Sequence, residues 1–287
     1  MFIIFDMESK ILKFLVLTDI HDTWVFLHKM LLLAGEMDGV IFLGDLMTFR
    51  KVNLDSFTNF AKIKDASNWL VGVPGNGPLP KVREYFDELG INLHCKGRTI
   101  DDIGFFGVGG VQETLGTISE LREFFKNEDT SSITPNDREL ETLNTFGIFF
   151  ENNRFAVEDW SEARMNDMEV YTSPFEHTEE RIYEILSNAF KEIEQTTTQI
   201  LVSHVPPFES GIASSSPIGV STGSKGISKF ILEKNPTLSI SGHSHRHHEF
   251  VIGKTRCITF PAAMNGFYGI LSIEQQRNEI ETSIHTF

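Results

Sequence analysis

Short apolar runs rich in Val, Ile, Leu and Phe recur along the chain, and polar residues follow each of them. The runs occupy residues 13–21, 39–46, 68–76, 103–110, 199–207 and 237–245. Near-continuous apolar runs of this kind are typical of strands that are buried on both faces of a sheet. Helix-like segments lie between them, at 23–35, 54–65, 78–89, 178–195 and 223–234. This alternation predicts βαβ units and an α/β fold class.

The C-terminal part of the chain has a different pattern. Residues 249–260 contain a Gly-Lys turn between two apolar runs, and residues 268–287 contain a polar turn near 276–278. Both segments predict antiparallel hairpins. We therefore expect a C-terminal antiparallel portion after the βαβ units.

Residues 112–171 interrupt the rhythm of strands and helices. They hold 14 acidic and 5 basic residues, so −9 of the formal net charge of −15 falls in this segment. We predict a single domain over residues 1–287 that an acidic, partly helical insertion interrupts at 112–171. The insertion is either a variable surface excursion or a cap or partner-docking surface near the active site.

Composition limits the class of protein. With 287 residues, 40% of them hydrophobic, the chain can bury a sizeable core. The two cysteines, Cys95 and Cys257, form no CxxC pair, which indicates a reducing compartment. No apolar run approaches the ~20 residues of a membrane helix, so we expect a soluble, cytoplasmic protein without membrane contact. The net charge of −15 disfavours nucleic-acid binding, because an acidic surface repels polyanions. The oligomeric state stays open.

Side chains that can bind metals follow five of the six apolar runs. In open α/β sheets, functional residues gather at the carboxyl ends of the strands. Single members have simpler explanations, such as a helix N-cap for Asp19, a satisfied loop histidine for His204 and a turn residue for Asn76. Their joint occurrence predicts one site. The candidate ligands are Asp19, His21, Asp45, Asn76, His204, His243 and His245.

The spacing and chemistry of these residues indicate a pair of metal ions. The i, i+2 spacing of Asp19 with His21, and of His243 with His245, puts each pair on one side of an extended segment. Seven ligands are too many for one tetrahedral zinc but suffice for two ions if a carboxylate bridges them. Nitrogen and oxygen ligands without thiolate suit Mn, Fe, Zn or Ni. Two such divalent ions leave about one net positive charge after two carboxylates and a hydroxide are counted, which suits a phosphate ester.

At these residues the sequence resembles the calcineurin-like metallophosphoesterases. The family motifs D-x-H, G-D, G-N, a lone His and G-H-x-H occur in the family's order. Here they are Asp19-Ile-His21, Gly44-Asp45, Gly75-Asn76, His204 and Gly242-His243-Ser-His245. The resemblance implies a four-layer α-β-β-α sandwich. It also implies a small phosphoester substrate, with a phosphodiester favoured over a monoester, attacked in line by a metal-bridging hydroxide.

The resemblance also assigns the ligands to two metal ions. It implies that Asp19, His21 and His245 hold one metal and that Asn76, His204 and His243 hold the other, with Asp45 bridging. Asn76 is also a possible phosphate contact.

Gly77 stands where many members have a histidine that acts on the leaving group, although some small members also lack it. Asp22 or His247 could replace that histidine, and its loss favours good leaving groups such as aryl esters.

The departure at Gly77 and the acidic insertion keep a second interpretation open. In this interpretation the protein has the same fold but is a non-catalytic scaffold that binds partners. A metallo-β-lactamase interpretation of "HSHRHH" leaves Asp19, Asp45 and Asn76 unexplained.

Residues 219–230 form a Gly/Ser-rich loop that enters a predicted helix, and they lack the Gly-Lys of a Walker A motif. Ser224 and Lys225 could contact substrate there, or could only cap the helix. His247 and His248 are expected to be surface histidines.

Overall fold

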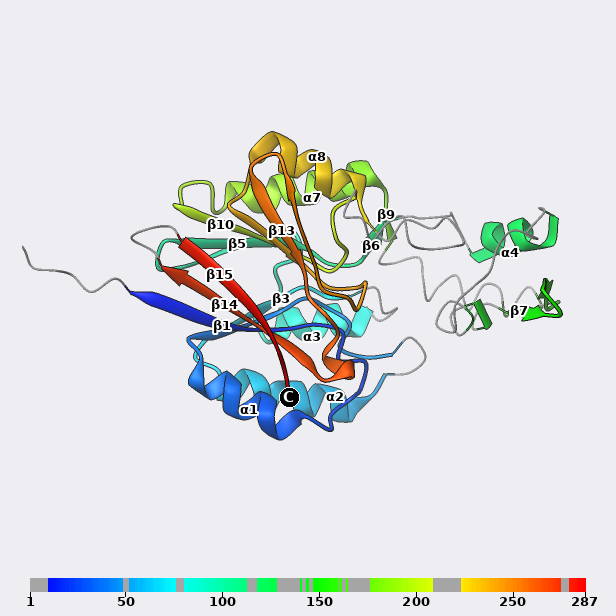
Figure 1. The fold of residues 1–287 in the computed structure, drawn as a ribbon, viewed down its shortest axis with the longest axis horizontal. Coiled ribbons are helices and arrows are strands. Elements are labelled where there is room, and N and C mark those ends of the chain that lie inside the picture. Colours follow the sequence, from blue (N-terminus) through cyan, green and yellow to red (C-terminus); the bar gives the residue numbers. More distant parts are fainter. Residues whose placement is uncertain are drawn as a thin grey trace, which may run out of the picture.

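The structure, a computed structural model, describes residues 10–48, 52–75, 80–112, 118–127, 140, 143–144, 147–159, 161, 164, 176–208, 223–274 and 279–287. Two β-sheets lie face to face, and helices cover the outer face of each sheet (Figure 1). These layers of helix, sheet, sheet and helix confirm the fold class that the motifs implied. The apolar pattern alone had predicted the βαβ units but not their division between two sheets.

The first sheet contains β1 (Ile11–Leu17), β2 (Gly39–Phe42), β3 (Leu70–Gly72), β14 (Phe267–Glu274) and β15 (Glu279–Thr286). Its strand order is β15-β14-β1-β2-β3. The three N-terminal strands are parallel, whereas β14 pairs antiparallel with both β1 and β15.

The second sheet contains β4 (Gly97–Ile100), β5 (Ile103–Val108), β10 (Thr198–Ser203), β11 (Leu238–Ser241), β12 (His248–Ile252) and β13 (Thr255–Thr259). Its strand order is β12-β13-β11-β10-β5-β4. The four inner strands are parallel, and the two edge strands, β12 and β4, are antiparallel to their neighbours.

Successive side chains of the parallel strands enter different cores, as the period of two in a strand requires. In β1, Phe14 and Val16 lie in the core between the two sheets, whereas Leu15 and Leu17 face the outer helices. The outer helices of the first sheet are α1 (Leu27–Glu36), α2 (Leu54–Ala66) and α3 (Pro80–Glu88). Those of the second sheet are α7 (Glu179–Lys191) and α8 (Lys225–Lys234). Burial on both faces explains why these strands read as continuous apolar runs.

Both predicted C-terminal hairpins are confirmed, as β12–β13 and β14–β15. The polar turn predicted near 276–278 lies outside the described residues. The apolar pattern missed β4, an edge strand whose four residues are only half-buried or exposed. None of the described helices combines the length and apolarity that a membrane span requires.

The predicted insertion at 112–171 begins at β6 (Val111–Gln112), which pairs in parallel with β9 (Glu176–His177), a strand that lies beyond the predicted end of the insertion. Its described parts are helix α4 (Ile118–Asn127) and a hairpin of β7 (Ile148–Glu151) and β8 (Arg154–Val157). Phe125, Leu143 and Ile148 form a small apolar cluster of their own there. Figure 1 shows α4 and β7 beyond β6 and β9, apart from the two sheets. The division into one domain with an insertion stays a prediction.

Candidate metal centre

The candidate ligands in the described residues follow the carboxyl ends of four strands. The first sheet supplies three of them after β1 and β2, and the second sheet supplies three after β10 and β11. In chain order they are Asp19, His21, Asp45, His204, His243 and His245. The structure brings these six side chains together at one end of the sandwich. Asn76, the seventh predicted ligand, and Gly77 lie outside the described residues.

Most of these residues sit in left-handed backbone turns. The φ angle is 51° at Asp19, 46° at His21, 55° at Asp45, 65° at His243 and 56° at His245. Such conformations cost an L-residue about 1–3 kcal/mol each and persist where the surrounding structure determines them. Main-chain hydrogen bonds connect the turns, from Asp19 N to Gly44 O at 2.9 Å and from His21 N to Asp45 O at 3.1 Å.

This geometry corrects one step of the sequence argument. The i, i+2 spacing was expected to act through an extended segment, and that expectation was wrong. His21 and His245 reach the centre because the chain turns sharply after each strand, with positive φ at both residues. The convergence therefore comes from the turns and not from the pleat of a strand.

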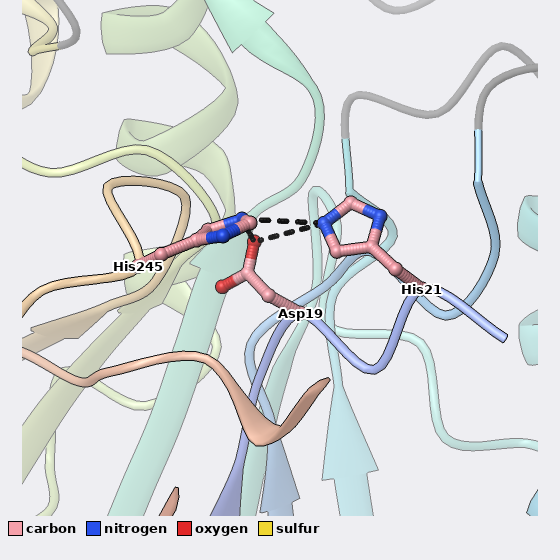
Figure 2. A group of neighbouring side chains, drawn as sticks. All are labelled: Asp19, His21 and His245. Atoms are coloured by element: carbon pink, nitrogen blue, oxygen red, sulfur yellow. Dashed lines mark hydrogen bonds and ion pairs between the residues drawn. The ribbon is translucent and has the colours of Figure 1, made fainter. Parts of the chain in front are cut away.

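Asp19 lies at the meeting point of two histidines from different sheets (Figure 2). Its Oδ1 is 3.0 Å from His245 Nε2 and 3.6 Å from His21 Nε2. The two Nε2 atoms are themselves 3.2 Å apart. These three ligand atoms are close enough to share one ion.

Asp45 occupies the matching position between His21 and His204. Its Oδ2 is 3.5 Å from His21 Nε2 and 3.4 Å from His204 Nε2. Asp19, Asp45 and His204 form a second group whose ligand atoms could share an ion. The ring of His243 packs edge-on against His204, with centroids 5.0 Å apart. Asp19 belongs to both groups, and Oδ2 of Asp45 lies between His21 of the first group and His204 of the second, a position from which it could bridge two ions.

The two buried carboxylates are strongly biased toward the charged form. Burial raises the pKa of Asp19, but the attraction of the neighbouring histidines His21, His245 and His204 outweighs burial and holds that pKa well below its usual value. Burial likewise raises the pKa of Asp45, whereas His204 and His21 lower it, with a net result of about 2. Both side chains therefore offer anionic oxygen ligands at neutral pH.

The histidines divide according to their neighbours. Burial lowers the pKa of His204, but the Asp45 carboxylate raises it, and the result is about 9. Burial and the positive charge of His204 together lower the pKa of His243 to about 3. Without cations, a proton on His204 therefore supplies positive charge that the two carboxylates require.

The residues fit a pair of divalent cations. Asp19 Oδ1 is fully buried, and it makes no hydrogen bond with any residue that the structure describes. An orphaned anionic oxygen is rare unless a cation or ordered solvent binds it. His204 Nδ1 lies 2.8 Å from Leu43 O, so it donates there, and Nε2, 3.4 Å from Asp45 Oδ2, is the ring nitrogen that faces the cluster. Carboxylate oxygens and imidazole nitrogens without thiolate suit divalent transition metals.

The N-terminus of α8 already holds an anion from the protein itself. Ser224 Oγ donates to Glu179 Oε2 at 2.5 Å and accepts from Ile227 N at 3.2 Å. The N–H groups of Lys225 and Gly226 donate to the same carboxylate at 3.0 and 2.7 Å. Ser224 is thus the N-cap of α8, and the substrate contact expected at Ser224 and Lys225 stays a prediction.

The two possible replacements for the absent histidine have other bonds. Asp22 Oδ1 accepts from Ser56 Oγ at 2.5 Å, and Asp22 Oδ2 accepts from both N and Oγ1 of Thr48 at 2.9 Å. Asp22 therefore fastens the turn after β1 to the turn after β2 and to α2. The ring of His247 is exposed, and its Nδ1 lies 3.2 Å from Thr259 O.

Thr18 is a site residue that sequence reasoning missed. It is buried, with 1% of its surface exposed, and its Oγ1 donates to Asp19 Oδ2 at 2.6 Å. A signal existed in the sequence, because Thr18 is a polar residue inside the apolar run that directly precedes the first acidic ligand.

The fold and the cluster together define the class of protein, an α-β-β-α sandwich with a candidate site for divalent metals where the carboxyl ends of its two sheets meet. The family model for calcineurin-like phosphoesterase matches residues 12–247, so the chain belongs to the calcineurin-like phosphoesterase family. This confirms the resemblance read from the motifs. Family membership indicates a metal-dependent phosphoesterase, and the family typically binds two divalent metals.

The chain is also similar to individual proteins. The chain is 27% identical over 201 residues to the uncharacterized protein MJ1162 of Methanocaldococcus jannaschii, a match that covers 66% of this chain and 82% of the relative. The crystal structure of TT1561 from Thermus thermophilus superposes with a TM-score of 0.61 at 14% identity. That match covers 96% of this chain and 99% of the other, and it shows the shared fold.

Proposed function

We propose that the protein is a two-metal hydrolase of small phosphodiesters, with water as the nucleophile in an in-line displacement. The observation that carries this proposal is the position of Asp45. Its Oδ2 lies 3.5 Å from His21 Nε2 and 3.4 Å from His204 Nε2, between ligands supplied by different sheets. A single carboxylate in that position can join two cations into one catalytic centre.

The residues divide into two ligand sets. Asp19, His21 and His245 would hold one ion, and Asp45 would bind both ions. His204 and His243, together with Asn76, would hold the second ion. When bound, the pair of cations supplies Lewis acidity toward the phosphoryl oxygens and a nucleophile formed from water. Manganese, iron, zinc and nickel all match the nitrogen and oxygen donors.

Charge supports a diester in preference to a monoester. Two divalent cations, two carboxylates and one hydroxide leave about one net positive charge at the centre, if the imidazoles are neutral. A phosphodiester carries one negative charge and matches this value, whereas a monoester dianion exceeds it. The net charge of −15 on the whole chain further disfavours approach of highly charged substrates, including nucleic acids.

The absence of a histidine at position 77 also favours substrates with stable leaving groups. Gly77 replaces a histidine that many family members use to protonate the leaving oxygen. Asp22, a candidate substitute, already accepts hydrogen bonds from Ser56 and Thr48. Aryl esters leave readily without a proton, so we expect them to react faster than alkyl esters.

The proposal is tested by hydrolysis of a bis-aryl phosphate after metal removal with EDTA and addition of Mn²⁺. Asp45→Asn removes the bridging charge and is expected to lower kcat at least 100-fold, a loss of ~2.7 kcal/mol in transition-state stabilisation. Asp65→Asn, at an exposed position of α2, serves as the matched control and is expected to retain wild-type turnover. Equal turnover in Asp45→Asn and the wild type would rule out the bridge.

A comparison of two substrates tests the diester preference separately. The same aryl group is supplied as a diester and as a monoester, each with Mn²⁺. The proposal expects a higher kcat/KM for the diester. A higher value for the monoester would assign the protein to the phosphomonoesterases without affecting the two-metal centre.

A second candidate function, a partner-binding scaffold, is supported by the acidic insertion. Its described residues contain an apolar cluster of their own, and Figure 1 shows α4 and β7 apart from the two sheets. Replacing 112–171 with a short linker distinguishes the two functions. Loss of partner binding in a protein without measurable turnover favours the scaffold, whereas metal-dependent turnover in either form favours the hydrolase.

A further inference from the structure

The two oxygens of the Asp19 carboxylate have very different surroundings. Oδ2 accepts two hydrogen bonds, from Thr18 Oγ1 at 2.6 Å and from His243 N at 3.0 Å. Oδ1 accepts none from the described residues and faces the Nε2 atoms of His245 and His21. One oxygen is thus fixed by the protein, and the other is left for a cation.

Thr18 can make this bond because the chain closes tightly over it. A Cβ added to Gly242 would lie 1.9 Å from Thr18 Oγ1 and 2.8 Å from Asp19 Oδ2. Only glycine at 242 therefore leaves room for the hydroxyl while His243 N reaches the same carboxylate. Gly242 N also donates to His204 O at 3.0 Å, so the backbone around Gly242 is bonded to the backbone of another candidate ligand.

The rotation of the carboxylate is the property that these bonds control. A carboxylate free to rotate could present either oxygen, or both, to a cation. With Oδ2 held by two donors, Asp19 presents only Oδ1, and it does so beside both histidines of its ligand set. Hydrogen bonds of this kind to ligating carboxylates typically change metal affinity 10- to 100-fold when they are removed.

We propose that Thr18 is a positioning residue for the metal centre, and that its hydroxyl orients Asp19 so that Oδ1 alone binds the ion. This inference rests on the two-metal centre of the proposed function. Thr18 has no part in the ligand set and touches no reacting atom. Thr18 acts on the affinity for the ion that Asp19, His21 and His245 would hold, and it has little effect on the affinity for the second ion.

The test compares Thr18→Ala with Thr18→Ser. Both variants lose the buried methyl group, and only the serine keeps the hydroxyl, so their difference isolates the hydrogen bond. Each EDTA-treated protein is titrated with Mn²⁺ by calorimetry. We expect Thr18→Ala to bind one of its two Mn²⁺ ions ~10- to 100-fold more weakly than the wild type. Thr18→Ser is expected to bind both ions with wild-type affinity.

A control variant and a stability measurement exclude a general packing effect. Ser203 precedes a ligand and is buried, but its hydroxyl donates to Val205 O at 2.8 Å. Ser203→Ala is expected to leave both Mn²⁺ affinities unchanged. Thermal melting of the EDTA-treated proteins shows whether each variant folds, and Thr18→Val, which keeps the side-chain volume, replaces Thr18→Ala in the titration if the alanine variant does not fold.

The outcomes separate this inference from the proposed function. If the wild type binds two Mn²⁺ ions and Thr18→Ala binds them equally well, the role of Thr18 is wrong and the metal centre stands. Equal weakening in Thr18→Ala and Thr18→Ser assigns the effect to the lost methyl group and also overturns the role. If the wild type binds no Mn²⁺, the metal centre itself is wrong.

Discussion

His204 Nε2 lies 3.4 Å from Asp45 Oδ2, and the opposite nitrogen of the same ring lies 2.8 Å from Leu43 O. The imidazole is therefore held between a carbonyl, which can only accept, and a carboxylate, which is the proposed bridge. This arrangement fixes which nitrogen faces the centre. We therefore expect pH to act on metal binding through His204.

Metal affinity is expected to rise with pH. Burial lowers the pKa of His204, yet the Asp45 carboxylate raises it from 6.5 to about 9 in the metal-free protein. Between pH 6.5 and about 9, His204 of the metal-free protein carries a proton that a metal ion must displace. The apparent affinity should therefore rise about tenfold per pH unit for one released proton and level off above pH ~9.

Calorimetry with Mn²⁺ in buffers of different ionisation enthalpy measures the released proton directly. His204→Gln is expected to bind one fewer Mn²⁺ ion and to lose this pH dependence. Lys254→Gln, in the distant turn between β12 and β13, is the control and is expected to behave as the wild type. An affinity that is independent of pH between 6.5 and 9 would contradict the prediction.

Gly75 is expected to be essential because the chain passes directly against Asp45. A Cβ at residue 75 would lie 1.9 Å from Asp45 Oδ1 and 2.2 Å from Asp45 N. Gly75→Ala should therefore displace the carboxylate, lower metal affinity and lower kcat more than 100-fold. The magnitude follows from the ~10²-fold losses that a 1 Å misplacement can cause.

Gly35→Ala is the matched control for that substitution. Gly35 lies in α1, and the closest atom to an added Cβ is Ala66 O at 3.7 Å, an ordinary contact. Alanine is favoured over glycine in a helix interior by ~1 kcal/mol, so this variant should melt at an equal or higher temperature and keep its turnover. Similar behaviour of the two variants would show that the contact with Asp45 does not matter.

Asp22→Asn distinguishes a structural role from an acid role. The carboxylate accepts three hydrogen bonds, from Ser56 Oγ and from N and Oγ1 of Thr48. We expect the amide to lower the free energy of unfolding by ~1–3 kcal/mol, because it cannot satisfy all three donors. Urea unfolding measures this loss.

The leaving-group dependence of hydrolysis completes that test. An acid that protonates the leaving oxygen matters more for alkyl than for aryl esters. If Asp22 is structural, the ratio of aryl to alkyl turnover is the same in Asp22→Asn and in the wild type. A selective loss of alkyl turnover in the variant would identify Asp22 as the acid.

Much of the layered fold could be predicted from the sequence, because burial on both faces leaves a strong signal. Phe14 and Leu15 face different cores and are both apolar, so the run around them marks a central strand. Strand β4 leaves no such signal, since its residues are half-buried or exposed. The assignment of strands to two sheets depends on pairings such as β1 with β14, which join residues more than 250 positions apart.

The identity of the candidate ligands was also accessible from the sequence, but their mode of convergence was not. Polar residues after buried strands are visible in the sequence, as at Asp45 and His204. The positive φ angles at His21 and His245 arise from turns that other segments hold in place, and no local pattern indicates them. The bond from Thr18 to Asp19 likewise depends on Gly242, which comes from the other sheet.

Ser224→Ala separates a helix cap from a substrate contact. Ser224 accepts from Ile227 N and donates to Glu179 at the N-terminus of α8, and Thr178 accepts from Arg181 N in the same way at the N-terminus of α7. Loss of an N-cap typically costs ~1 kcal/mol, so Thr178→Ala should lower the free energy of unfolding by about that amount, and Ser224→Ala should lower it further because the bond to Glu179 is also lost. The Michaelis constant for a bis-aryl phosphate distinguishes the two roles of Ser224. If Ser224 only caps α8, KM is the same in both variants and in the wild type. If Ser224 binds the phosphate, KM rises in Ser224→Ala and not in Thr178→Ala, because only the loop before α8 would then contact the substrate. The tight contact with Glu179 leads us to expect the first result, measured by urea unfolding and steady-state kinetics on the same preparations.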